Sequence, residues 1–288
     1  MRKLYLIVSL TVALLSIHQV KAQDLTNYDL YVQNPVLYNP AYTVDSVKMK
    51  AFLNSRLQWV GIDGAPRSNL FSIYGNFKNN MGVGISVSNF KQGLTSNTYV
   101  DINYGYRVHF AEDHYLTLGI SLGTLSNNLD VSKVSSSTDF TDQQLIDNSY
   151  KQLTISSKAG LSYVYKNFEV QVVMPQMLEN NTVSNYTLGI IGYNFKLSPI
   201  VDLKLVSMIR GVSTSPAQID FNAVGTWKKM VWFQASYRSN KSYLFAAGFN
   251  YKMISLGYAS EINTNVYSVI SKSSHEIQLI YSFGGLVH

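Results

Sequence analysis

Apolar and polar residues alternate with a period of two along most of the chain from residue 48 onwards. Successive side chains of a β-strand point to opposite faces, so this pattern predicts strands with one apolar and one polar face. In the stretch 100–110, for example, the apolar Val100 and Ile102 flank Asp101. No stretch after residue 22 has the 3.6-residue period of a helix or a continuous apolar run of about 20 residues, which excludes membrane-spanning helices.

The alternation divides into fourteen candidate strands, so the sequence predicts an all-β fold. Clusters of turn-forming residues separate these strands. The predicted strands span residues 48–59, 67–77, 81–90, 95–110, 115–127, 153–165, 168–174, 184–197, 200–211, 217–227, 230–238, 242–251, 253–261 and 275–283.

Short and long connections alternate between these strands. The connections that lie between the short ones tend to be longer, especially 128–152, 175–183 and 262–274. Outer-membrane β-barrels have short periplasmic turns and longer external loops. The sequence therefore predicts a transmembrane antiparallel β-barrel of about 14 strands with both termini in the periplasm. Every second connection is tight: Lys78-Asn79-Asn80, Ala111 to His114, Lys166-Asn167, Ser198-Pro199, Lys228-Lys229 and Lys252.

Charged residues within the predicted strands gather on one face. If the apolar face contacts lipid, charge is expected opposite it, because Arg or Lys on the lipid face costs about 2–4 kcal/mol near the midplane. The strand at 184–197 is ambiguous, since Leu188-Gly189-Ile190-Ile191 blurs the alternation before Lys196, and a β-bulge there would restore it. Thirteen charges are expected to face the lumen: Lys50, Arg56, Asp101, Arg107, Lys158, Glu169, Asp202, Lys204, Arg210, Asp220, Arg238, Glu261 and Glu276.

A soluble β-sandwich would show the same alternation with its apolar face inside, and it stays the alternative fold. The barrel is favoured by the number of strands, by the unequal connections and by the predicted secretory signal peptide at residues 1–22. A closed barrel also leaves no unpaired strand edge, as hydrocarbon requires. Only 14% of the residues are charged, against about 25% in soluble domains, which fits a large lipid-facing surface.

The first 22 residues have the features of a secretory signal peptide. A basic start at Arg2-Lys3 precedes the apolar stretch 4–17, and Val20-Lys21-Ala22 offers a cleavage site. An anchor helix is the alternative, but Lys21 interrupts the apolar stretch early. Cleavage lowers the formal net charge from +6 to +3, which removes support for nucleic-acid binding. The chain has no cysteine, so disulfides and a cysteine-linked lipid anchor are excluded.

Residues 23–47 form a separate segment, broken by Asn34-Pro35 and Asn39-Pro40. These dipeptides predict an extended, turn-rich chain. The segment is expected to lie in the periplasm or to plug the lumen of the barrel, which is expected to span residues 48–288. The expected lumenal charges are seven basic and six acidic, whereas an ion-selective pore is expected to carry rings of one sign. Balanced charge suits internal pairing and a filled interior; a non-selective pore is the alternative.

No catalytic, cofactor or metal site is predicted. His275 and Glu276 are neighbours in a strand and therefore point to opposite faces. Asp139, Asp142 and Asp147 lie in one long connection without the spacing of a calcium-binding EF-hand loop. The chain also lacks a Gly-x-Ser-x-Gly motif and a cysteine nucleophile, so an enzyme is not expected.

Three stretches of the mature chain resemble the PorP/SprF family of outer-membrane proteins, which is associated with the type IX secretion system of Bacteroidetes. Departures are Glu261, where the family pattern leads us to expect Asp, and the extension beyond Phe283. The similar stretches are Tyr31-Val32-Gln33-Asn34-Pro35-Val36-Leu37-Tyr38-Asn39-Pro40-Ala41-Tyr42, Arg56-Leu57-Gln58-Trp59-Val60-Gly61-Ile62-Asp63-Gly64-Ala65-Pro66, and the closing Tyr237-Arg238, Gly257-Tyr258 and 275–283.

The resemblance implies a non-enzymatic barrel that supports secretion or cell-surface attachment of partner proteins, such as gliding adhesins. Its partners would be type IX cargo, other secretion components and outer-membrane lipid. The alternative is a diffusion channel or transporter for small solutes. The motif positions expected to shape the barrel or bind partners are Asn34, Pro35, Asn39, Pro40, Ala41, Tyr42, Arg56, Gln58, Trp59, Gly61, Gly64, Ala65 and Pro66.

Overall fold

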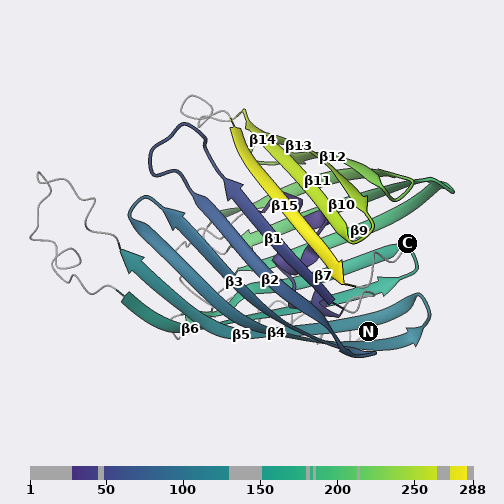
Figure 1. Cartoon of the computed structure of the whole chain (residues 1–288), viewed down its shortest axis with the longest axis horizontal. Coiled ribbons are helices and arrows are strands. Elements are labelled where there is room, and N and C mark those ends of the chain that lie inside the picture. Colours follow the sequence, from purple (N-terminus) through teal and green to yellow (C-terminus); the bar gives the residue numbers. More distant parts are fainter. Residues whose placement is uncertain are drawn as a thin grey trace, which may run out of the picture.

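The computed structural model describes residues 28–44, 49–129, 151–179, 182–183, 186–212, 215–264 and 273–283. The predicted signal peptide, 1–22, and the connection that carries Asp139, Asp142 and Asp147 lie outside the described residues. Within the described ranges, fourteen long strands form a closed antiparallel barrel (Figure 1), as the sequence predicted.

Most strands are longer than the hydrophobic pattern predicted, and one two-residue strand, β8, was not expected. The strands are β1 (Met49–Leu57), β2 (Arg67–Lys78), β3 (Met81–Gln92), β4 (Thr95–Ala111), β5 (His114–Leu129), β6 (Lys151–Tyr165), β7 (Phe168–Glu179), β8 (Thr182–Val183), β9 (Thr187–Ser198), β10 (Val201–Val212), β11 (Ser215–Trp227), β12 (Val231–Arg238), β13 (Ser242–Tyr251), β14 (Ile254–Asn263) and β15 (Ser273–Phe283).

Each long strand pairs with its neighbours along the chain, and the first and last strands close the barrel. Met49 of β1 lies opposite Phe283 of β15, and the pairing continues to Leu57 opposite His275. On the far side β6 pairs with β7, and β7 with β9. Each long strand therefore has a paired strand on both sides, as a hydrocarbon environment requires, although β7 pairs with β9 only over residues 168–173.

The two ends of the barrel differ. Tight turns at 79–80, 112–113 and 166–167 lie at one end, to the right in Figure 1, together with the start of β1 and the end of β15. We call this the tight-turn end and the opposite one the loop end. The connections 93–94 and 239–241 at the loop end are also short, so the difference between the ends is smaller than the sequence predicted.

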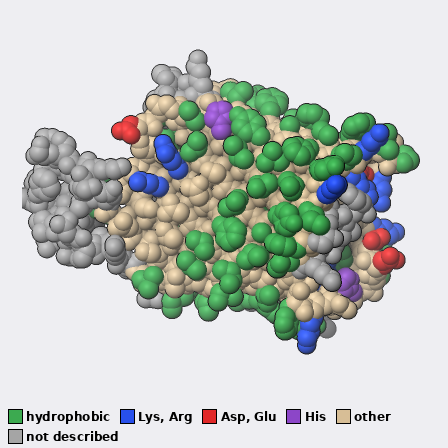
Figure 2. Space-filling model, viewed as in Figure 1, with side chains coloured by type: hydrophobic (Ala, Val, Ile, Leu, Met, Phe, Trp, Pro, Cys, Tyr) green, Lys and Arg blue, Asp and Glu red, His purple; other side chains and the backbone are tan. Residues whose placement is uncertain are grey.

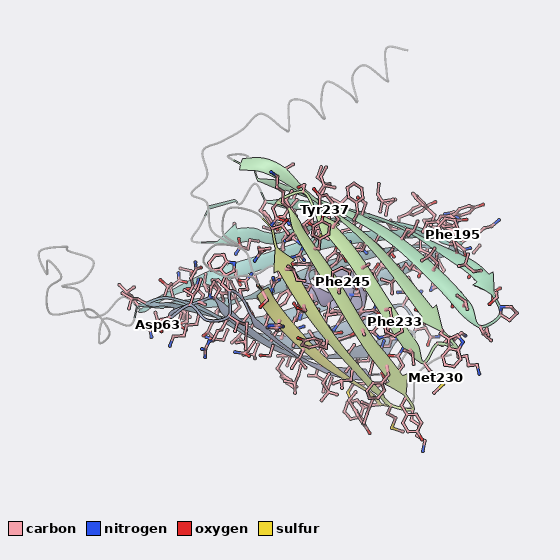
Figure 3. All side chains as sticks on the ribbon, turned by 90° about the horizontal axis from the view of Figure 1, so that it is seen from above. Asp63, Phe195, Met230, Phe233, Tyr237 and Phe245 are labelled. Atoms are coloured by element: carbon pink, nitrogen blue, oxygen red, sulfur yellow. The ribbon has the colours of Figure 1, made fainter. Side chains whose placement is uncertain are left out.

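Apolar side chains cover the outside of the barrel. Ile102, Leu122 and Phe233 are each more than 60% exposed. Figure 2 shows such side chains over the strand face, with Lys and Arg gathered toward the ends. In Figure 3 Phe233 and Phe245 point outward from the barrel wall. This distribution is expected of a surface that contacts lipid.

The strand that was ambiguous in the sequence, β9, needs no bulge within its apolar run. Leu188 and Ile190 are buried and lie on the same face as Lys196, while Ile191 is 54% exposed to the outside. The register of β9 against β10 shifts only at its far end, near Val201. A bulge at 188–191 is therefore not needed to place Lys196, because two lumenal positions of this strand, Leu188 and Ile190, are themselves apolar.

The helices of the described residues are three short 3-10 turns in the N-terminal part: η1 (Leu30–Val32), η2 (Pro35–Leu37) and η3 (Pro40–Thr43). None of them is long and apolar enough to cross a membrane.

Candidate functional site: the N-terminal segment in the lumen

Residues 28–44, here called the N-terminal segment, fold into η1, η2 and η3 because of their Asn-Pro dipeptides. A residue before proline avoids the helical region, and proline itself favours the first position of a helical turn. Asn39 accordingly has φ −110° and ψ 108°, and its side chain accepts a hydrogen bond from the N–H of Ala41. The segment is thus more compact than the extended chain that the sequence predicted.

The N-terminal segment lies inside the barrel and is almost completely buried. Leu30, Tyr31 and Tyr38 pack against apolar lumenal side chains that include Leu188 and Met208. A barrel of eight strands can fill its interior with its own side chains, but the diameter grows with the number of strands. A barrel of fourteen strands has a wider interior, and in this chain the N-terminal segment occupies it.

Four glycines make room for η3. They occupy paired positions on four successive strands, Gly82 opposite Gly105, Gly105 opposite Gly119, and Gly119 opposite Gly160. A Cβ atom on any of them would overlap the segment, at Thr43, Ala41 or Asn39. We call these four residues the glycine row. Only glycine lets the backbone of the segment approach the barrel wall this closely.

Hydrogen bonds attach the segment to the wall beside the glycine row. The Asn39 side-chain amide donates to Gln171 Oε1 (3.1 Å) and to the carbonyl of Leu161 (3.3 Å). Arg107 Nη2 donates to the carbonyl of Val44 (2.7 Å). These bonds satisfy buried polar groups that would otherwise lose their partners on leaving water.

Asp29 connects the other end of the segment to a buried network of charges. Its Oδ1 lies 3.0 Å from Arg56 Nη1 and 2.8 Å from Arg238 Nη2, and all three side chains are at most 3% exposed. The carboxylate of Glu276 accepts hydrogen bonds from the backbone N–H groups of Asp29 (2.6 Å) and Leu30 (3.1 Å). Asp29 is the one charged residue among residues 28–44, so it carries all ion pairing between segment and wall.

The barrel residues of this network pair with one another as well. Glu261 lies 2.5 Å from Arg56 and 2.8 Å from Arg238. Asp220 lies 2.8 Å from Arg210 and 3.3 Å from Arg238. We call these residues and Asp29 the Asp29 network. Most members lie near the loop ends of their strands, so the segment extends from the tight-turn end, where it leads to β1, into the loop half of the lumen.

The remaining lumenal charges form separate pairs. Lys158 Nζ lies 2.5 Å from Asp101, and Lys204 Nζ lies 3.5 Å from Glu169. Asp202 is half-buried and lies opposite Lys196 in the strand register. Each of the thirteen charges that the sequence assigned to the lumen is at a buried or half-buried position.

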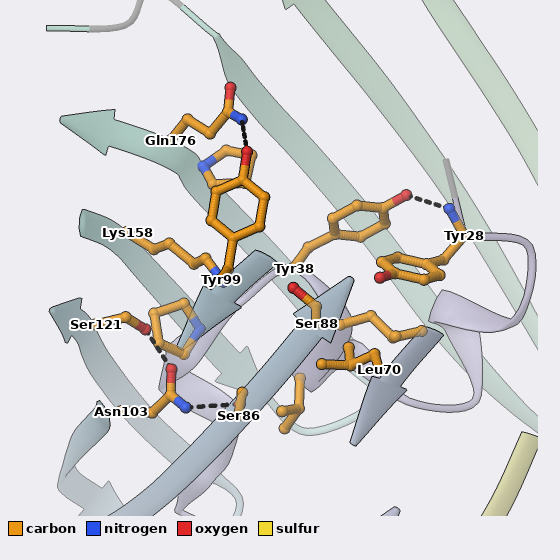
Figure 4. A pocket seen from close by; sticks show the side chains of 14 residues that line it. Tyr28, Tyr38, Leu70, Ser86, Ser88, Tyr99, Asn103, Ser121, Lys158 and Gln176 are labelled. Carbon is orange, nitrogen blue, oxygen red and sulfur yellow. Dashed lines mark hydrogen bonds between the residues drawn. The ribbon is translucent and has the colours of Figure 1, made fainter. Parts of the chain in front are cut away.

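A small cavity remains beside the segment, between Tyr38, Leu70 and the strands β3 to β7 (Figure 4). Its volume is about 60 Å³, which is room for a few waters. Its lining is mixed: Asn103 donates to Ser86 Oγ (2.8 Å), and Gln176 donates to the hydroxyl of Tyr99 (3.3 Å).

The motif at 56–66 covers the end of β1 and the connection 58–66 to β2. The backbone conformation of this connection explains its glycines. Gly61 has φ +98° and Gly64 has φ +71°, values that favour glycine. The N–H of Gln58 donates to the carbonyl of Pro66 (2.9 Å), and that of Gly93 to Gly64 (2.8 Å). Trp59 is half-buried and Ala65 lies beside Gly64, so these motif residues give the loop its shape, whereas Arg56 reaches the lumen.

The histidine that the sequence singled out lies on the outer face, where His275 Nδ1 is 2.7 Å from the hydroxyl of Tyr258. In the described part of the chain no three His, Cys, Asp or Glu side chains gather in a way that could hold a metal ion.

Three buried tyrosines of the segment make its docking sensitive to alkaline pH. Burial raises the pKa of Tyr28, Tyr31 and Tyr38 above the ordinary value of about 10. The docked segment favours the neutral phenols, so docking is complete below that pH. It weakens as the pH rises above it, because the phenols of a released segment ionise at a lower pH than those of the docked one. Ultraviolet titration should show three tyrosines that ionise late, and replacing all three with phenylalanine should remove this late phase. Equal late phases in both proteins would contradict the burial of these phenols.

Comparison with known proteins identifies the family. The family model of the type IX secretion system membrane protein PorP/SprF matches residues 20–281. The chain belongs to the PorP/SprF family. This membership assigns the barrel to the outer membrane and to type IX secretion, in agreement with its apolar outer surface. No protein of curated function matches the sequence.

Solved outer-membrane barrels share the fold of this PorP/SprF protein. Omp33 of Acinetobacter baumannii has a TM-score of 0.53 at 7% identity, over 82% of this chain and 98% of its own. The toluene transporter TbuX of Ralstonia pickettii has a TM-score of 0.53 at 10% identity, over 86% and 92% of the two chains. The monoaromatic hydrocarbon channel CymD has a TM-score of 0.52 at 10% identity, over 91% and 95%. At these identities the likeness concerns the fold alone.

Proposed function

We propose that this PorP/SprF protein supports the secretion or cell-surface attachment of type IX cargo, such as gliding adhesins, by binding other proteins and not by catalysis. One observation carries the proposal: the N-terminal segment occupies the lumen and is held there by the glycine row and the Asp29 network. A barrel filled by its own chain offers its rims and loops, and not a pore, to its partners.

In this proposal residues 1–22 are removed as a signal peptide, and the tight-turn end faces the periplasm. Met49 and Phe283 both lie at that end, so the barrel begins and ends on the periplasmic side. The loop end, with the connection 58–66, then faces the cell exterior, where cargo is secreted or retained.

Deleting the gene tests the proposal. The expected result is that cargo with type IX sorting signals disappears from the cell surface or shifts into the culture fluid, and that the wild-type gene restores its location. Cargo that stays in place in the deletion strain would overturn the proposed function.

A channel for small solutes is the second candidate, since two barrels with this fold, TbuX and CymD, are described as a transporter and a channel, and a cavity remains beside Tyr38. Liposome swelling separates the two functions. Solute entry at a rate comparable to that of an open porin would favour the channel, and its absence favours the partner-binding barrel.

A further inference from the structure

Lysines occupy an unusual backbone conformation at the tight-turn end. In the described chain six residues other than glycine have positive φ, and five of them are lysines. Lys166, Lys228, Lys229 and Lys252 have φ between 49° and 54° and lie in three of the tight turns. A side chain in this left-handed conformation is energetically unfavourable, and glycine is the usual choice. Two-residue hairpin turns require positive φ at their central residues, and at these positions the chain carries lysine.

Each of these turns joins its lysine to an aromatic ring on the lipid face. Lys166 Nζ lies 5.4 Å from the ring centre of Tyr165, Lys228 4.7 Å from Trp227, and Lys252 5.2 Å from Tyr251. A fourth turn repeats the arrangement with Lys78, 6.0 Å from Phe77. The four rings are between 46% and 70% exposed. Exposed aromatic rings at the end of a membrane strand mark the depth of the lipid head groups.

The lysines carry a charge that the described protein does not balance. No carboxylate of the described residues forms an ion pair with Lys78, Lys166, Lys228, Lys229 or Lys252. The tight turns described contain two acidic residues, Glu112 and Asp113, in another turn. The positive charge is densest across the neighbouring turns β11–β12 and β13–β14, where three of the lysines lie.

We propose that these aromatic–lysine turns bind the phosphate groups of anionic glycerophospholipids in the leaflet at the tight-turn end. The aromatic ring contacts the upper acyl chain while the lysine beside it pairs with the head group, and the strained turn holds the ammonium at that depth. Anionic lipid then gathers around β11 to β14 and fixes the depth and orientation of the barrel.

Trp227 offers a direct probe of this binding. The full mature chain carrying Trp59→Phe is reconstituted in phosphatidylcholine vesicles with a minor fraction of brominated phosphatidylglycerol or, separately, brominated phosphatidylcholine. The other remaining tryptophan, Trp232, is 3% exposed and faces the lumen, so lipid-dependent quenching reports on Trp227. We expect several-fold stronger quenching by the anionic lipid at equal mole fraction, and a smaller difference at high salt.

The variant Lys228→Gln/Lys229→Gln/Lys252→Gln should bring the two lipids to equal quenching, and the corresponding arginine variant should keep the difference. Lys241→Gln is the matched control, because Lys241 also has positive φ (65°) but lies at the loop end. Equal quenching by both lipids in the parent protein would overturn the proposal. So would a preference that survives the three glutamines or is lost with Lys241→Gln alone.

Discussion

Replacing Asp29 with asparagine is expected to release the N-terminal segment from the lumen, with a loss of docking free energy of about 3–5 kcal/mol. Asparagine keeps the shape of the side chain but not its charge. Arg56 and Arg238 would then remain buried and share Glu261, with Asp220 as a further partner of Arg238 alone. Two guanidinium groups with too little negative charge beside them make the docked state less favourable.

Chymotrypsin detects this release, because the segment contains tyrosines and leucines that are buried in the docked state. Cleavage at Tyr31 and Tyr38, followed by mass spectrometry, should be slow in the parent protein and fast in Asp29→Asn. Asp63→Asn is the control, since Asp63 is exposed in the 58–66 loop and lies outside the network. Unchanged protection of the segment in Asp29→Asn would contradict the role given to the network.

Adding one methyl group to the glycine row is expected to displace η3 while leaving the barrel intact. In Gly119→Ala the new Cβ would overlap the backbone of Pro40 and Ala41, which cannot move aside without leaving the wall. Overpacking of this kind costs about 1–3 kcal/mol, which corresponds to an increase of roughly fivefold to over a hundredfold in the open population. Alanine forms the same backbone pairs with β4 and β6, so the strand itself loses nothing.

Gly192→Ala provides the matched comparison. Gly192 also faces the lumen, but its added Cβ would lie 3.6 Å from Val206 and 3.7 Å from Glu169, which is ordinary contact. Chymotrypsin should cleave the segment much faster in Gly119→Ala than in Gly192→Ala. Equal rates in the two variants would show that the close approach at the glycine row does not govern docking.

The barrel was predictable because its pattern is local. A period of two and the confinement of charge to one face follow from strand geometry and from the cost of charge in lipid, and both are visible within ten residues of sequence. The same rule failed at Leu188 and Ile190, since an apolar lumenal residue that contacts the N-terminal segment has the same sequence pattern as one that contacts lipid.

The centre of the site was not predictable from the sequence. Asp29 is one of three aspartates in the polar stretch 23–47, and its partners Arg56 and Arg238 come from strands far apart in the chain. The glycine row is partly visible in the sequence: Gly105 and Gly119 occupy the polar faces of their strands, where a small residue leaves space for another part of the chain. Only the pairing register of the strands shows that the four glycines lie next to one another.

Single-channel recording in planar bilayers tests the central claim, that this PorP/SprF barrel is closed by its own N-terminal segment. The mature wild-type protein should show no sustained conductance, whereas Asp29→Asn should show openings as the segment leaves the lumen. Steady conductance of the wild-type barrel, unchanged by Asp29→Asn, would contradict the account and favour a channel.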